Sequence, residues 1–174
     1  MRVRGVPYDD LADAGRAVAA ALREVQVELG NGAVVLAVLP GGAPVARVVA
    51  TELKLPVVAV RVTRDPEGAS ATLVGTSPES LAGRTLVIVD DGVESGVAAH
   101  AAVTLAKSLD PQQLVFAVPV CHAQAAADLI PRVDVLVSPH RPFTPRALRW
   151  EYKVFAPPAT EAEALRILEP LGLE

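Results

Sequence analysis

Cysteine and aromatic residues are scarce in this chain. Its 174 residues include one cysteine, and aromatic side chains make up only 3% of the sequence. A single cysteine excludes an internal disulfide and is typical of proteins that fold in a reducing compartment, so we expect a cytoplasmic protein. Most of the few aromatics lie late in the chain, at Phe143, Trp150, Tyr152 and Phe155, which suggests a distinct local role for the C-terminal third.

Long apolar runs and clusters of basic residues are also missing. Hydrophobic residues make up 51% of the chain, yet no unbroken apolar run approaches the roughly 18 residues that a membrane span needs. The first seven residues lack the apolar core of a secretory signal. The net charge is −4 and Lys and Arg are scattered, which disfavours binding to nucleic acid. We therefore expect neither a membrane nor a nucleic acid as a partner.

What the sequence does contain is a regular alternation of helix and strand patterns, as in a single domain over residues 1–174. Apolar residues recur at helical spacing behind Asp10 as far as Gly30, and β-branched runs separate further helical stretches. This order predicts an α/β fold, an open, mostly parallel five-stranded sheet flanked by helices. Strands are predicted at about 33–39, 56–62, 86–89, 114–120 and 133–137, and helices at about 11–29, 44–53, 96–109 and 123–130.

Two segments interrupt this alternation. Residues 63–80 are polar and contain turn-forming Pro and Gly, with only a possible short strand at 71–74, so we expect a mobile excursion there. Residues 138–155 are polar and aromatic and follow a core of about residues 10–137. A last helix is predicted behind Thr160, because Glu163 three residues later completes a capping box.

The segment from Leu86 to Gly96 carries the clearest functional signal. Four apolar residues, three of them β-branched, indicate a buried strand, and Asp90 and Asp91 follow directly. A loop with two glycines and Ser95 then leads into a helix. Loop amides at a helix N-terminus bind phosphate, whereas carboxylates accept hydrogen bonds from sugar hydroxyls or bind a hydrated metal. A sugar phosphate satisfies both surfaces; a solvated Asp-Asp-Gly turn is the structural alternative.

This run resembles the phosphoribosyl-pyrophosphate (PRPP) motif of type I phosphoribosyltransferases, and the chain is most similar to uncharacterised bacterial phosphoribosyltransferase-domain proteins. The resemblance implies that Asp90 and Asp91 are catalytic and hold the ribose hydroxyls. It implies Mg²⁺ bound through PRPP and water with no direct metal ligand, pyrophosphate and a nucleobase or nucleotide as partners, and a homodimer. The 5-phosphate would lie on the Ser95 hydroxyl and on the amides of Gly92, Val93, Glu94, Ser95, Gly96 and Val97.

A second stretch, residues 39–46, resembles the pyrophosphate loop of the same family. Gly41 and Gly42 let the backbone approach an anion closely and present N–H groups to it. The family's basic residue before these glycines is Pro40 here. Proline supplies neither a positive charge nor a hydrogen-bond donor. The pyrophosphate end of the expected site therefore has less positive charge than is typical of the family.

Two arginines are candidates for the missing charge. Arg61 ends an otherwise apolar strand, where the resemblance implies a basic residue directed at pyrophosphate; the alternative is an arginine that reaches out to water. Arg64 lies in the polar excursion, which resembles the family's flexible loop over the substrate. Its alternative is an ordinary surface charge.

Glu94 is a second departure from the family pattern. Hypoxanthine-guanine enzymes of this family carry an aspartate there that handles the purine N7 proton, so the resemblance makes Glu94 a candidate catalytic general base. The alternative is that a carboxylate beside a phosphate loop repels the ligand or lies on the surface without a role.

The resemblance makes residues 138–174 a hood and C-terminal helix over the site. Phe143, Trp150 and Tyr152 are then candidates to stack on a base, with core packing as the alternative. Cys121, His122 and His140 are too few for a zinc site.

The sequence therefore predicts a phosphoribosyltransferase that uses PRPP and Mg²⁺ to transfer a phosphoribosyl group between pyrophosphate and a nitrogenous base. The alternative is a non-catalytic PRPP or nucleotide sensor on the same fold. Pro40 and the few basic residues of segment 63–80 favour that alternative.

Overall fold

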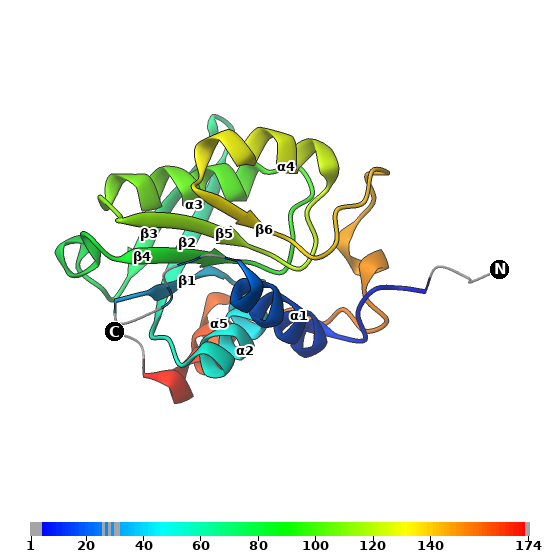
Figure 1. The fold of residues 1–174 in the computed structure, drawn as a ribbon, viewed down its shortest axis with the longest axis horizontal. Helices are drawn as coiled ribbons and strands as arrows, with labels where there is room; N and C mark the ends of the chain where they lie inside the picture. Colours follow the sequence, from blue (N-terminus) through cyan, green and yellow to red (C-terminus); the bar gives the residue numbers. More distant parts are fainter. Residues whose placement is uncertain (1–4, 26, 28, 30–31, 173–174) are drawn as a thin grey trace.

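The computed structural model describes residues 5–25, 27, 29 and 32–172, and the strands of this part form one sheet (Figure 1). The strand order is β3-β2-β1-β4-β5-β6. All neighbouring strands are parallel except β2 and β3, which are antiparallel. The strands are β1 (Val34–Leu39), β2 (Val57–Asp65), β3 (Gly68–Val74), β4 (Thr85–Val89), β5 (Gln113–Ala117) and β6 (Val135–Val137).

In the described part of the chain, five α-helices cover the two faces of the sheet. Figure 1 shows α1, α2 and α5 on one face and α3 and α4 on the other, and each group packs its own apolar cluster against the strands. Every residue of the central strands β1 and β4 is buried, and all of them except Thr85 are apolar, as is typical of strands covered on both faces. The predicted α/β class is confirmed. The helices are α1 (Leu11–Glu24), α2 (Ala43–Leu53), α3 (Val97–Ser108), α4 (Ala123–Leu129) and α5 (Glu161–Leu168).

The predicted helix starts are confirmed, but the end of the first helix is not. The Asp10 carboxylate accepts a hydrogen bond from the Asp13 amide at 2.8 Å, and the Thr160 hydroxyl accepts one from the Glu163 amide at 3.2 Å. Helix α1 ends at Glu24 because the β-branched Val25 has an extended backbone. Gly30, the predicted end of this helix, lies outside the described residues.

The sheet has a sixth strand where five were expected. Much of the polar excursion at 63–80 is the hairpin of β2 and β3, followed by a short 3₁₀ helix, η1 (Pro78–Leu81). Ala69, Ala71 and Leu73 are half-buried on the α3 side, whereas Ser70 and Thr72 between them are exposed. This two-residue alternation is the strand signal, and it is weak because alanine, serine and threonine carry little hydrophobic contrast.

The carboxyl ends of the parallel strands gather several loops at one edge. The turn at 40–43 follows β1, the loop at 90–96 follows β4, and the segment 138–155 follows β6. That segment, called the hood below, contains the 3₁₀ helix η3 (Leu148–Glu151); η2 (Ile130–Arg132) and η4 (Glu169–Leu171) follow α4 and α5. Within the part of the chain that the structure describes, none of the helices combines the length and the apolar character of a membrane span.

Candidate active site

Two adjacent carboxylates stand at the end of β4. Asp90 is 9% exposed, and its Oδ1 accepts a hydrogen bond from the Asp91 amide at 2.8 Å. Burial raises the pKa of Asp90 well above its usual range, and the neighbouring Asp91 raises it further. Burial likewise raises the pKa of Asp91 to about 6, with a contribution from the charge of Glu94. Such a pair, with Asp90 buried and Asp91 half-buried, favours a ligand that donates hydrogen bonds or carries positive charge.

The acid pair lines a cavity of about 360 Å³. Its other walls come from separate parts of the chain: the loop after β4, the first turn of α3, the β2–β3 hairpin and the C-terminal segment. Of the described residues on these walls, Arg64 is the only one with a positive charge. The lining residues are Arg64, Asp90, Asp91, Gly92, Val93, Glu94, Ser95, Ala98, Ala99, Leu148, Phe155 and Pro157.

The loop after β4 is fixed at one point and otherwise leaves its amides open. The Val93 amide donates to the Val120 carbonyl at 2.8 Å, so it is not available to a phosphate. No described residue accepts a hydrogen bond from the amides of Glu94, Ser95 or Gly96. Gly96 has a φ of +84° at the start of α3, a conformation that favours glycine. Three open amides at the N-terminus of a twelve-residue helix suit an anion.

The glycine turn after β1 lies directly against the acid pair. A Cβ atom on Gly41 would come within 2.7 Å of Asp91 Oδ2, and one on Gly42 within 2.9 Å of the Asp90 Cα atom. Only glycine therefore allows the two loops to approach this closely. The Gly42 amide already donates to the Val38 carbonyl at 2.8 Å, so it serves the turn itself. Pro40 begins the turn and carries no charge.

The two candidate arginines lie on opposite faces of β2. Arg61 makes two hydrogen bonds of 2.6 Å to the carboxylate of Glu161, in the first turn of α5. This ion pair raises the pKa of Arg61 and lowers that of Glu161. Arg64 instead lines the cavity. The alternation along the strand separates the two side chains, and the Glu161 partner, 100 residues further along the chain, has no local sequence signal.

The family is decided by comparison with known proteins. The family model for the phosphoribosyl transferase domain matches residues 8–139. The chain belongs to this family. The matched part of this phosphoribosyl transferase domain contains the glycine turn, both arginines, the acid pair and the loop after β4, whereas nearly all of the hood lies beyond it. No curated protein matches the chain significantly.

Several solved structures share the fold of this phosphoribosyl transferase domain. TT1426 from Thermus thermophilus is 26% identical, with a TM-score of 0.76, over 95% of this chain and 99% of that one. A purine phosphoribosyltransferase from Pyrococcus horikoshii is 20% identical, with a TM-score of 0.56, over 74% and 80% of the two chains. A Neisseria gonorrhoeae protein with bound ppGpp is 18% identical, with a TM-score of 0.56, over 94% and 97%.

The aromatic residues of the hood divide between surface, core and cavity. Phe143 is 91% exposed, and Trp150 is 56% exposed with the Arg149 guanidinium 4.9 Å from its ring; neither lines the cavity. Tyr152 is buried, and its hydroxyl donates to the Asp91 carbonyl at 2.6 Å. Phe155 lines the cavity, with its ring 5.0 Å from that of Tyr152. The aromatic wall of the cavity is therefore Phe155, which was not among the predicted stacking residues.

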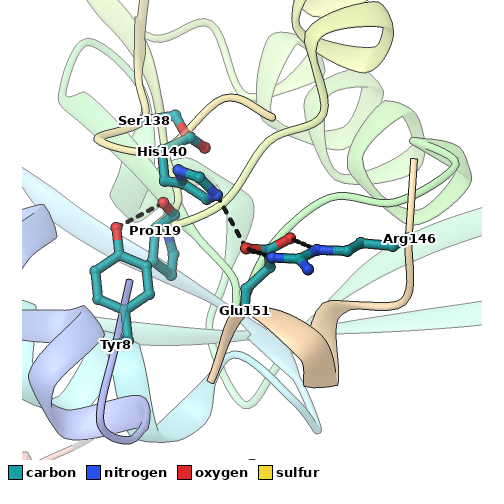
Figure 2. A network of polar contacts seen from close by, with 6 residues as sticks. All are labelled: Tyr8, Pro119, Ser138, His140, Arg146 and Glu151. Carbon is teal, nitrogen blue, oxygen red and sulfur yellow. Dashed lines mark hydrogen bonds and ion pairs between the residues drawn. The ribbon is translucent and has the colours of Figure 1, made fainter. Parts of the chain in front are cut away.

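A buried carboxylate that the sequence did not indicate organises the hood (Figure 2). Glu151 is fully buried and accepts hydrogen bonds from Arg146 at 2.5 and 2.9 Å and from His140 Nε2 at 2.9 Å. Arg146 chiefly, with His140, lowers the pKa of Glu151. Beside this network the Tyr8 hydroxyl donates to the Pro119 carbonyl at 2.8 Å. His140, Arg146 and Glu151 all belong to the hood, so the network holds the hood together. The Tyr8 amide, which donates to the Glu151 carbonyl at 3.3 Å, joins the hood to the rest of the phosphoribosyl transferase domain.

The remaining polar candidates do not form a metal site. Cys121 and His122 are both buried, Cys121 pairs with Val93 of the loop after β4, and burial raises the pKa of the Cys121 thiol to about 11. His140 belongs to the Glu151 network. Across the described ranges, His, Cys, Asp and Glu form no group of three or more that could hold a metal ion.

Proposed function

We propose that this protein binds PRPP with Mg²⁺ and transfers its phosphoribosyl group between pyrophosphate and a nitrogenous base. The observation that supports the proposal is one cavity in which the acids Asp90 and Asp91 stand beside open amides at the start of α3. A ribose 5-phosphate needs both kinds of surface side by side, because its hydroxyls donate hydrogen bonds and its phosphate accepts them.

Each part of the ligand has a partner of suitable chemistry. The two ribose hydroxyls donate to the carboxylates of Asp90 and Asp91, and the 5-phosphate accepts from the amides of Glu94, Ser95 and Gly96. The pyrophosphate extends toward the glycine turn and Arg64. The Mg²⁺ ion would be carried on the pyrophosphate and its waters, where it would stabilise the leaving group.

The reaction needs positioning more than acid or base groups. A ring nitrogen of the base forms a bond to the anomeric carbon while the bond from that carbon to the pyrophosphate oxygen breaks, and its electron pair leaves with pyrophosphate. The anionic acid pair stabilises the positive charge that develops on the ribose. Phe155 provides an apolar aromatic surface for the ring of the base.

A PRPP or nucleotide sensor is the second candidate. Pro40 brings no charge, and Arg61 is already paired with Glu161, so Arg64 alone remains to neutralise a pyrophosphate among the described cavity residues. A site that binds the sugar phosphate firmly and the leaving group weakly suits recognition without turnover. The similarity in fold to a Neisseria gonorrhoeae protein with bound ppGpp is in keeping with this candidate.

One assay separates the two functions. The protein is incubated with PRPP, Mg²⁺ and, one at a time, adenine, hypoxanthine, guanine, xanthine, uracil and orotate, and released pyrophosphate is measured. We expect release with one base or one class of bases. PRPP binding in calorimetry without release for any base would support the sensor. Absence of PRPP binding would overturn both candidates.

Arg64→Ala is expected to weaken PRPP binding about ten- to a hundredfold, because an ion pair with phosphate contributes about 1.5–3 kcal/mol. Ribose 5-phosphate, which lacks the pyrophosphate, should lose much less affinity. Arg61→Ala is the matched control, since its guanidinium is already bound to Glu161. Calorimetry with both ligands measures the effect, and equal losses in the two variants would contradict the assignment of Arg64.

A further inference from the structure

Three contacts fasten the hood to the loop after β4. The Leu148 amide donates to Glu94 Oε1 at 2.7 Å, and the Tyr152 hydroxyl donates to the Asp91 carbonyl at 2.6 Å. The Leu148 side chain also covers Gly92, where an added Cβ would lie 2.5 Å from Leu148 Cδ2. The hood is therefore attached to the residues that line the ribose and phosphate side of the cavity.

The Glu94 carboxylate acts as an N-terminal cap of η3. Ala147 stands at the N-cap position of η3 and has no side-chain oxygen to accept a hydrogen bond from the first amides. The Glu94 carboxylate provides this acceptor from 54 residues away in the sequence. A hydrogen bond from a backbone amide to an ionised carboxylate is short and strong. The Glu94 side chain is thus one of the contacts that position η3.

We propose that Glu94 is a positioning residue that holds the hood at the base side of the cavity and does not transfer a proton. Leu148, which it anchors, lines the same cavity as the acid pair, together with Phe155, the surface proposed for the base. Loss of the anchor frees this wall, so it weakens binding of the base and leaves the ribose and phosphate contacts in place. The kinetic consequence rests on the proposed function, whereas the anchoring of the hood does not.

Two substitutions separate the possible roles of Glu94. Glu94→Gln keeps a side-chain oxygen that accepts a hydrogen bond from the Leu148 amide, but it cannot act as a general base and it removes the charge. Glu94→Ala removes the acceptor as well. A positioning role therefore survives the glutamine substitution, whereas proton transfer and repulsion of phosphate do not.

The single tryptophan of the chain reports on the hood directly. Trp150 lies within η3, so its fluorescence follows this helix without any turnover. We expect acrylamide quenching of Trp150 to rise roughly twofold in Glu94→Ala and to stay at the wild-type level in Glu94→Gln. Glu24→Ala, which changes an exposed glutamate at the end of α1, is the matched control and should match the wild type in quenching and kinetics.

In kinetic assays Glu94→Ala should raise the KM for the base about tenfold with a smaller change in kcat, and Glu94→Gln should restore that KM. Unchanged Trp150 quenching in Glu94→Ala would overturn the proposal. A hundredfold loss of kcat in Glu94→Gln would also overturn it, because that result would identify Glu94 as a general base. Tighter PRPP binding in both variants would overturn it as well, because that result would show that the Glu94 carboxylate repels the phosphate. If the wild type transfers no phosphoribosyl group, the proposed function fails and the quenching result alone decides the anchoring role.

Discussion

The double substitution of Asp90 and Asp91 by asparagine is expected to lower PRPP affinity more than about a hundredfold. Two ribose hydroxyls then lose hydrogen bonds to charged acceptors, each of which contributes about 1.5–3 kcal/mol. Asparagine has nearly the same shape and retains one carbonyl oxygen, so the fold should persist. Titration calorimetry with PRPP and Mg²⁺ measures the loss. Asp110→Asn is the control, because Asp110 is exposed and has a φ of +52°, which asparagine adopts readily.

The same double variant should also be more stable than the wild type above neutral pH. Burial raises the pKa of both acids, so the folded protein binds more protons than the unfolded chain, and the free energy of unfolding falls as the pH rises. The fall begins near pH 4, where the unfolded chain ionises, and extends through the Asp91 pKa of about 6 and beyond it as Asp90 ionises.

The variant lacks this penalty, so we expect it to gain about 1–3 kcal/mol over the wild type at pH 8 and nothing at pH 4. Denaturant unfolding at the two pH values tests the difference. A loss of PRPP affinity together with a gain in the free energy of unfolding would show that the two acids serve ligand binding and not the stability of the fold. A variant less stable at both pH values would instead show that the pair supports the fold.

Gly42→Ala is expected to have the largest effect on stability, a loss of about 2–4 kcal/mol. The added Cβ would lie 2.6 Å from the Val38 carbonyl oxygen and 2.9 Å from both the Asp90 Cα and the Val89 carbonyl oxygen. All three neighbours are backbone atoms of β1, β4 and the loop after β4, so no side-chain rotation relieves the clash. Relief requires that the turn move away from the acid pair.

Chemical denaturation of Gly42→Ala and Gly5→Ala measures this effect. Gly5 is the matched control, because a Cβ there meets no atom within 4 Å. We expect Gly5→Ala to stay within about 0.5 kcal/mol of the wild type. A loss that small in Gly42→Ala would show that the turn is looser than the structure has it and would weaken the argument that the two loops form one site.

The parts that the sequence predicts well are those with a local physical cause. Apolar runs rich in β-branched residues are typical of strands buried on both faces, and they identified β1 and β4. The order of strand, acids, glycine loop and helix fixes the place of Asp90 and Asp91, because the carboxyl end of a parallel strand opens at one edge of the sheet. Strand β3 was uncertain because its alternating residues differ little in hydrophobicity.

The parts that escaped prediction depend on contacts between distant residues. The pairing of Arg61 with Glu161 and the hydrogen bond from Leu148 to Glu94 join positions 100 and 54 residues apart. Neither spacing leaves a periodic trace in the sequence. In the hood, the short 3₁₀ helix directs Trp150 outward, and the chain beyond it brings Phe155 to the cavity. The local path of the backbone thus decides which aromatic side chain lines the cavity. The presence of aromatic residues in the sequence does not specify that path.

A crystal structure with PRPP and Mg²⁺ tests the central claim most directly. The account expects the ribose hydroxyl oxygens within hydrogen-bond distance of the Asp90 and Asp91 carboxylates, the 5-phosphate on the amides of Glu94, Ser95 and Gly96, and the pyrophosphate near Arg64. PRPP bound elsewhere, or a cavity that stays empty at a saturating concentration of PRPP, would contradict it.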